Sequence, residues 1–114
     1  MAAFSGDVPG VALEVIGPKA GATAGDPVES ALELSDDGRV ATGIWEVTPG
    51  EFPSEKKGIS EFMHFVSGDA TITGDDGVSF EIRQGTALFL PDGWTGRWAV
   101  RETVRKTYVI VTTG

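Results

Sequence analysis

Glycine and proline interrupt this sequence so often that it has no room for a long helix. The 16 glycines and 6 prolines among 114 residues stand between short runs rich in Val, Ile, Thr, Phe and Trp, which favour β-strands. No window of a dozen residues combines helical periodicity with freedom from these breakers. The sequence therefore predicts a nearly all-β domain of short strands and tight turns, either a sandwich or a barrel.

Nine segments are predicted as strands from their β-forming residues. They are residues 11–16, 28–34, 39–47, 59–66, 70–73, 78–83, 87–90, 94–100 and 103–111. Asp36-Asp37-Gly38 and Asp75-Asp76-Gly77 predict tight hairpins, because each places a glycine where positive φ is needed. We expect one domain, in which residues 1–27 form an N-terminal strand and loop arm and residues 28–114 form the barrel.

Composition excludes several functional classes. The net charge of −8 repels phosphate backbones, so no nucleic acid partner is expected. The absence of cysteine excludes disulfides, thiolate catalysis and zinc–sulfur sites. No apolar run has a length suited to a membrane helix, and the N-terminus does not resemble a signal peptide. These features predict a cytoplasmic protein that does not bind membranes.

Two segments resemble the halves of the cupin signature. The first half of that signature runs G-x5-H-x-H-x3-4-E-x6-G, and Glu61 and Gly68 in EFMHFVSG match its E-x6-G. The second half runs G-x5-P-x-G-x2-H-x3-N, and Gly85, Pro91 and Gly93 in GTALFLPDG match its G-x5-P-x-G. The resemblance implies a cupin-type double-stranded β-helix, a jelly-roll barrel that holds one small ligand.

Further matches narrow this resemblance. GIWEVTPGEF at residues 43–52 and GRWAVRETVRKTYVIV at residues 96–111 are similar to small cupins related to the cupin domain of (S)-ureidoglycine aminohydrolase. The resemblance covers roughly residues 39–111. It implies a pocket lined by the inward faces of the two motifs.

The histidines that bind metal in cupins are absent. Their positions fall at Glu55, Lys57 and Gly96, so only Glu61 of the four usual ligands remains. One carboxylate cannot hold iron or manganese tightly, and we therefore predict no metal and no other cofactor. One alternative stays open, an unusual carboxylate-rich metal site drawn from Glu46, Glu55 and Glu61.

Glu61 and Lys106 are the candidate catalytic residues. Alternation puts Glu61 on one strand face with Met63 and Phe65, and Lys106 on one face with Tyr108. A buried carboxylate and a buried ammonium would each lower the cost of burying the other. We predict that the two pair inside the barrel, with Glu61 as proton carrier and Lys106 as its electrostatic partner. The alternatives are a structural ion pair, or a lysine whose amine reaches water at a strand edge.

The predicted ligand-binding residues surround this pair. Trp98 follows the second motif and is expected near the barrel mouth, where it could stack on a planar ligand, whereas Trp45 and Trp94 are expected to pack. Glu55 and Lys57 occupy former ligand positions, although Glu55-Lys56-Lys57-Gly58 also reads as a solvated loop. The full set of candidate ligand-binding residues is Trp98, Tyr108, Glu55, Lys57 and Glu46.

Two other groups of polar residues have both a functional and a structural interpretation. His64, the only histidine, falls on the face opposite Glu61 and is expected to pack or to contact another subunit. Arg97, Arg101 and Arg105 could form a carboxylate or phosphate site with Lys106, but pairing with nearby acids is the favoured alternative.

The predicted function is binding of a small polar metabolite, either by an enzyme or by a binding protein. As an enzyme, the chain would be a metal-independent isomerase, lyase or hydrolase. The alternatives are a non-catalytic sensing module, or a metal-dependent aminohydrolase-like cupin with the carboxylate-rich site. A homodimer is expected, because Phe62 and Val66 have no obvious cover within one small barrel.

Overall fold

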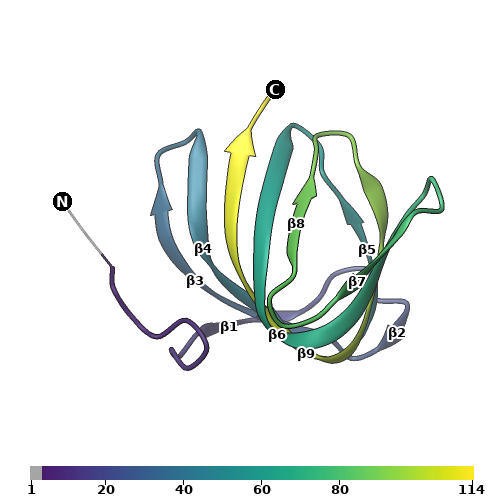
Figure 1. Cartoon of the computed structure of the whole chain (residues 1–114), viewed down its shortest axis with the longest axis horizontal. Helices are drawn as coiled ribbons and strands as arrows, with labels where there is room; N and C mark the ends of the chain where they lie inside the picture. Colours follow the sequence, from purple (N-terminus) through teal and green to yellow (C-terminus); the bar gives the residue numbers. More distant parts are fainter. Residues whose placement is uncertain (1–3) are drawn as a thin grey trace.

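The computed structural model describes residues 4–114, so residues 1–3 of the expected N-terminal arm lie outside the described residues. Across this range all regular structure is β-strand and no helix occurs, which confirms the all-β prediction (Figure 1). The strands are β1 (Glu14–Pro18), β2 (Ala24–Gly25), β3 (Val28–Asp36), β4 (Val40–Val47), β5 (Gly50–Glu55), β6 (Ile59–Gly74), β7 (Ser79–Ile82), β8 (Ala87–Leu90) and β9 (Thr95–Thr112). Accordingly, residues 4–114 contain no helix suited to crossing a membrane.

β9 is the central strand of one antiparallel sheet that curls into an open barrel (Figure 1). Its C-terminal half pairs with β4 and its N-terminal half with β5. β6 pairs along nearly the whole of β9 and carries β7 and β8 on its other side. Residues on one face of β9 therefore face the interior together with residues from β4, β5 and β6.

β6 and β9 are each longer than predicted. The sequence predicted separate strands at residues 59–66 and 70–73, and again at 94–100 and 103–111, but each pair forms one continuous strand. The register between β6 and β9 shifts three times between Phe65 and Ala70. Such irregularities bend a strand without ending it, so the interruptions in the pattern mark bends and not ends.

The N-terminal half contains the other errors of prediction. β1 begins at Glu14 and not at residue 11, and β2 lies within a segment predicted as a loop. β5 was not predicted, because Pro53 argues against a strand. β2 covers only the start of β5, where Ala24 and Gly25 lie opposite Glu51 and Gly50. Pro53 therefore has a free edge on that side, where proline is tolerated.

Alternation along β6 separates the barrel interior from its outer surface. Glu61, Met63 and Phe65 are buried, whereas Phe62 and His64 are exposed. This confirms the predicted faces of the strand. The apolar core on the inner face also includes Ala70 and Ile72 further along β6. It is completed by buried residues of other strands, namely Val47, Phe52, Ile82, Leu88, Leu90, Trp98, Val100 and Val104.

The N-terminal segment is fastened to the outer surface by Arg105 of β9. The Arg105 guanidinium donates hydrogen bonds to the backbone carbonyls of Val8 (3.0 Å) and Val11 (2.7 Å). It also donates to Glu46 on the neighbouring strand β4, at 3.1 Å. These contacts hold residues 8–11 against the barrel, so the described part of the expected arm packs on the barrel wall.

The outer face also carries exposed phenylalanines that bear on the expected homodimer. Phe62 and Phe89 are register partners on β6 and β8, with 45% and 57% of their surface exposed, whereas Val66 is half-buried. If a second copy covers these rings, light scattering at micromolar concentration will give twice the 12.0 kDa chain mass. The double variant Phe62→Ser/Phe89→Ser should lower that mass. A wild-type mass near that of one chain would contradict the prediction.

Candidate functional site

The barrel interior contains a pocket of about 340 Å³. Residues of β1, β3, β4, β5, β6 and β9 form its walls, together with Lys19 after β1 and Lys56 after β5. Among them are Trp45, Phe52, Lys56, Glu61, Trp98 and Lys106. A cavity of this size with apolar walls and a few polar groups is typical of sites for small metabolites.

Glu61 lies between two lysines at the buried end of this pocket. One carboxylate oxygen accepts a hydrogen bond from Lys106 Nζ at 2.6 Å, and the other accepts one from Lys56 Nζ at 2.9 Å. Glu61 is 3% exposed, Lys106 5% and Lys56 9%. The predicted contact between Glu61 and Lys106 is thus confirmed. Lys56, which the sequence pattern placed in a segment that also reads as a solvated loop, is an additional member of this cluster.

The strands explain how these three side chains meet. Glu61 of β6 is the register partner of Ile110 on β9, four residues from Lys106, so the two long side chains converge across the interior. Lys56 follows the last residue of β5. Its backbone N–H donates to the Trp94 carbonyl (2.8 Å), and its carbonyl accepts from the Gly93 N–H (2.6 Å). These bonds to the second motif hold Lys56 in place with its side chain directed inward.

The two lysines and the carboxylate shift one another's pKa. Burial alone would raise the pKa of Glu61, but the charges and hydrogen bonds of Lys106 and Lys56 hold it below its usual value. Burial lowers the pKa of Lys106 to about 8, against the attraction of Glu61. The pKa of Glu61 falls because its carboxylate faces two ammonium groups. The pKa of Lys106 falls because the attraction of one carboxylate does not make up for the hydration that the buried ammonium loses.

Aromatic rings form the rest of the wall around Lys106. Lys106 Nζ lies 4.5 Å from the centre of the Trp45 ring and 5.1 Å from that of Trp98, and both distances are suited to cation–π contacts. The Trp98 ring stacks on Phe52 with centroids 5.7 Å apart. Trp98 is therefore part of the packed wall deep in the pocket, and its predicted place near the mouth is wrong. Its indole N–H has no acceptor within residues 4–114, although buried donors are normally paired.

Tyr108 lines the pocket as predicted and lies close to the backbone of β4. A Cβ at Gly43 would overlap the Tyr108 hydroxyl and the Leu32 carbonyl, so only glycine leaves space for the ring there. Burial raises the pKa of Tyr108, and the Glu33 and Glu61 carboxylates add to that effect. The phenol therefore remains protonated at neutral pH and can donate a hydrogen bond to a ligand.

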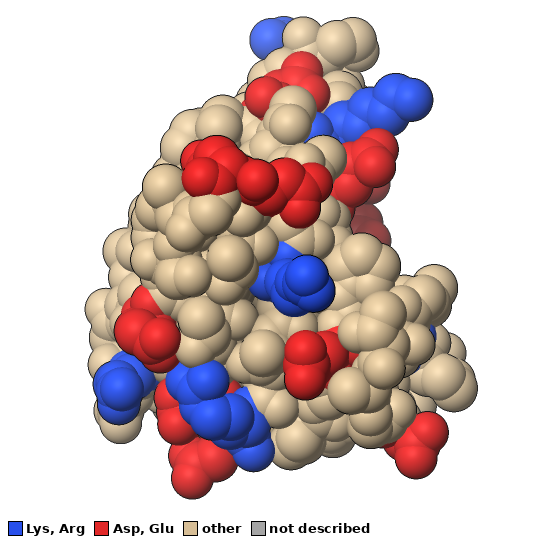
Figure 2. All heavy atoms as spheres, turned by 90° about the vertical axis from the view of Figure 1, so that its right-hand side faces the viewer, with Lys and Arg blue, Asp and Glu red and all other residues tan. Residues whose placement is uncertain are grey.

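The outer part of the pocket carries charges that the sequence analysis did not single out. Lys19 Nζ lies 3.9 Å from Glu29, and Glu29 also accepts a hydrogen bond from Trp45 Nε1 at 2.9 Å. Glu33, which is exposed, also lines this outer part of the pocket. Figure 2 shows acidic and basic side chains intermixed over one face of the molecule, without a large area of a single sign.

Three of the predicted ligand-binding residues lie outside this pocket. Glu55 and Lys57 are exposed, because alternation along β5 and beyond directs Ser54 and Lys56 inward instead. Glu46 lies on the outer face and pairs with Arg105. These three residues therefore do not line the interior pocket, although Glu55 lines a second, more open depression beside Arg97. The signature allows three or four residues between its H-x-H and its Glu, and a spacing of four would have pointed to Ser54 and Lys56.

The alternative metal site from Glu46, Glu55 and Glu61 is also wrong. Within residues 4–114 no three His, Asp or Glu side chains gather closely enough to hold a metal ion. Glu61 is already bound by two ammonium groups, and these would repel a cation. A side chain at Gly96, where a ligand histidine falls in cupins, would overlap the Thr73 carbonyl and the Trp94 ring. The residues present do not fit the metal that most cupins hold.

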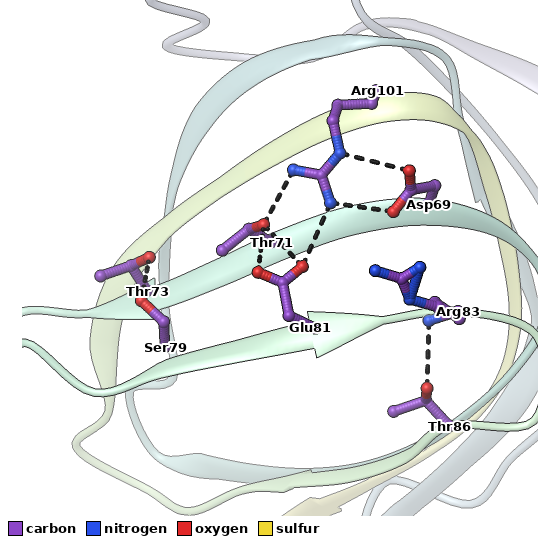
Figure 3. Close-up of polar contacts among 8 residues, drawn as sticks. All are labelled: Asp69, Thr71, Thr73, Ser79, Glu81, Arg83, Thr86 and Arg101. Atoms are coloured by element: carbon purple, nitrogen blue, oxygen red, sulfur yellow. Dashed lines mark hydrogen bonds and ion pairs between the residues drawn. The ribbon is translucent and has the colours of Figure 1, made fainter.

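The basic residues of β9 do not form one anion site. Arg101 donates to Asp69 (2.8 Å) and Thr71 (2.8 Å) of β6 and to Glu81 (3.2 Å) of β7, as Figure 3 shows. Arg105 binds Glu46 and the N-terminal segment. The favoured alternative, pairing with nearby acids, is confirmed for these two residues.

Solved structures resemble this fold over most of its length. A DUF861-family protein of unknown function from Pseudomonas syringae pv. tomato is 24% identical, with a TM-score of 0.78 over 89% of this chain and 45% of that one. The EutQ protein of Clostridium difficile is 21% identical, with a TM-score of 0.66 over 76% of this chain and 70% of that one. A DUF861-family protein from Thermotoga maritima is 34% identical, with a TM-score of 0.54 over 57% of this chain and 73% of that one. The chain spans about half the length of the Pseudomonas protein.

A search of curated proteins finds no match to this chain. A family model does match, over residues 34–108, which run from the end of β3 into β9. The matched region contains Lys56, Glu61 and Lys106. On this match, which covers about two thirds of the sequence, and on the cupin-type jelly-roll barrel, the chain belongs to the EutQ-like cupin domain family.

Proposed function

We propose that this chain binds a small metabolite carrying a carboxylate in the interior pocket, and that Lys106 exchanges a proton with that ligand in a metal-independent isomerase, lyase or hydrolase reaction. The observation that carries the proposal is the buried trio in which Glu61 bridges Lys56 and Lys106. Two ammonium groups and one carboxylate leave one positive charge without a counter-charge at the inner end of the pocket.

A ligand carboxylate supplies the missing negative charge. Each lysine ammonium has three donors, and Lys56 and Lys106 each use one of them on Glu61. The remaining donors can bind a carboxylate through charge-assisted hydrogen bonds, which are stronger than neutral ones.

Lys106 is better suited than Glu61 to carry the proton. Because Lys56 and Lys106 lower the pKa of Glu61, its carboxylate stays ionised at neutral pH. The pKa of Lys106 is about 8, so this amine can both release and accept a proton near neutral pH, as efficient general acid–base catalysis requires. The roles expected from the sequence are therefore exchanged, with Lys106 as proton carrier and Glu61 as its electrostatic partner.

Calorimetric titration with acetate, propionate and pyruvate tests the binding. Lys56→Met and Lys106→Met should each weaken binding by about tenfold or more, since each removes charge-assisted hydrogen bonds. Lys57→Met is the matched control, because Lys57 adjoins Lys56 in sequence but is exposed, and its affinity should equal that of wild type. Equal affinities for all four proteins would contradict the proposal.

Ureido acids are a second class of probe for the same titration. Residues 43–52 and 96–111 resemble the cupin domain of (S)-ureidoglycine aminohydrolase, which motivates this choice.

Deuterium exchange separates catalysis from binding alone. In D₂O the wild-type protein should speed the incorporation of deuterium into the methyl group of pyruvate, as followed by proton NMR, because the Lys106 amine can act as the base. Lys106→Met should lose this exchange, and Lys57→Met should retain it. Binding of pyruvate without faster exchange would favour a sensing module over an enzyme.

Carboxylate binding should weaken as the pH rises through about 8. Lys106, whose pKa is about 8, loses its positive charge in that range, and the attraction for an anion falls with it. The measurement is the affinity for propionate from pH 6 to pH 9.5, in wild type and in Lys106→Met. The variant should show a flatter profile, and an equally steep fall in both would contradict the assignment. The other ionisable groups around Lys106 are Glu61 of β6, Lys56 after β5, Lys19 after β1, Glu29 and Glu33 of β3, and Tyr108 of β9.

A further inference from the structure

We propose that Lys106 is a covalent nucleophile, and that its Nζ forms an imine with the carbonyl carbon of a small oxo acid held in the pocket. This inference rests on the proposed carboxylate binding and extends it to a specific class of ligand, the 2-oxo acids. The reaction uses only the amine of Lys106 and needs no cofactor.

The surroundings of Lys106 are those of a reactive amine. Its Nζ is buried, lies over the rings of Trp45 and Trp98, and lines the pocket. Desolvation in an apolar site and a second cation nearby are the two conditions that activate lysine as an imine-forming nucleophile. Lys56 supplies the second cation, because it binds the other oxygen of the same carboxylate.

The spacing of the two amines favours a 2-oxo acid over other carbonyl compounds. Lys56 and Lys106 bind the two oxygens of Glu61, so their ammonium groups lie on neighbouring parts of the wall. In a 2-oxo acid the carbonyl carbon is bonded directly to the carboxylate carbon. A ligand carboxylate bound to the free donors of Lys56 therefore brings that carbonyl carbon next to Lys106.

Glu61 is ionised at rest, but it accepts a hydrogen bond from Lys106 Nζ and can relay protons transiently between that nitrogen and the carbonyl oxygen. The ammonium of Lys106 first gives one proton to Glu61 and becomes a neutral amine. The nitrogen lone pair then forms a bond to the carbonyl carbon, and the carbonyl oxygen takes the proton from Glu61. A second proton passes from nitrogen through Glu61 to the same oxygen, which leaves as water as the C=N bond forms. The ammonium loses two protons, both of which leave in the water, and nothing is oxidised or reduced.

Trapping with pyruvate and cyanoborohydride at neutral pH tests the proposal in the full-length protein. The hydride reduces the imine to a stable secondary amine, so that peptide mass spectrometry should locate one carboxyethyl group on Lys106. Labelling of Lys106 should exceed that of exposed Lys57 by about tenfold or more, because at neutral pH an amine with a lowered pKa has a far larger neutral fraction than an ordinary lysine. Propionate, which has the carboxylate but no carbonyl, should protect Lys106.

The outcomes separate this inference from the proposed function. Adducts spread over Lys19 and Lys57 in proportion to their exposure, or no adduct at all, would overturn the inference. If pyruvate binds by calorimetry and Lys106 is not labelled, the imine fails while the carboxylate site stands. If pyruvate does not bind and propionate does not protect, both fail. Because the adduct is mapped in the wild-type protein, the result does not depend on whether Lys106→Met folds.

Discussion

Glu61→Gln is expected to lower the free energy of unfolding by about 3–5 kcal/mol, the usual cost of leaving a buried charge without its partner. The variant retains the size of the side chain but leaves the ammonium groups of Lys56 and Lys106 without a carboxylate between them. Lys106→Met should cost less, because Glu61 keeps its bond to Lys56. This order of effects is set by Lys56, since a simple Glu61–Lys106 pair would make the two changes similar.

A double-mutant cycle measured by urea unfolding tests this order. Glu61→Gln combined with Lys106→Met should cost less than the sum of the two single changes, because the second change removes a charge that the first left unpaired. Strictly additive effects would show that the two side chains are not coupled. Glu81→Gln is the control, because Glu81 belongs to the surface network around Arg101 (Figure 3). The urea midpoint of this variant should hardly change, since exposed ion pairs contribute little to stability.

The pH dependence of stability gives a second readout of the same change. The pKa of Glu61 is lowered in the folded protein from an ordinary value of 4.5. The carboxylate therefore stabilises the fold above about pH 4.5, and this contribution is lost as the pH falls below that value. Glu61→Gln should remove this part of the acid sensitivity. An unchanged acid profile in the variant would contradict the role of Glu61.

Gly68→Ala is expected to destabilise the fold more than replacing a glycine that has open space around it by alanine. Gly68 has φ of +109°, which favours glycine, and a Cβ there would lie 2.5 Å from the Thr103 carbonyl oxygen and from Val104 Cα. These are backbone atoms of β9 opposite the irregular register of β6, so they cannot move aside without disturbing that pairing. We expect a loss well above the roughly 1–3 kcal/mol of backbone strain alone.

Gly85→Ala is the matched control for this prediction. Gly85 has φ of +93°, but nothing lies within 4 Å of a Cβ at that position. Its replacement should cost only the backbone strain, about 1–3 kcal/mol. Thermal or urea unfolding of the two variants isolates the close approach of β9 at Gly68. Equal losses would show that conformational strain, and not this contact, explains the glycine.

The sequence by itself determined the all-β fold and the faces of β6, and it predicted the buried pair. Frequent Gly and Pro exclude helices, and strict alternation places Glu61 with Met63 and Phe65. The same rule places Lys106 beside Tyr108, and two opposite charges directed into one apolar interior lower each other's cost of burial. The positions of Glu61 and Gly68 in the signature follow from this geometry, since the first lies at the pocket and the second at the bend.

Only the tertiary structure decided which charged residues join that pair. Lys56 and Lys57 are adjacent and chemically identical, and a shift of one residue in the register of β5 exchanges the buried side chain for the exposed one. That register is fixed by the pairing of β5 with β9 and by the bonds of the Lys56 backbone to Gly93 and Trp94. These contacts join residues far apart in the sequence, so no local pattern shows them. For the same reason Glu46 was misplaced, because its partner Arg105 lies 59 residues away.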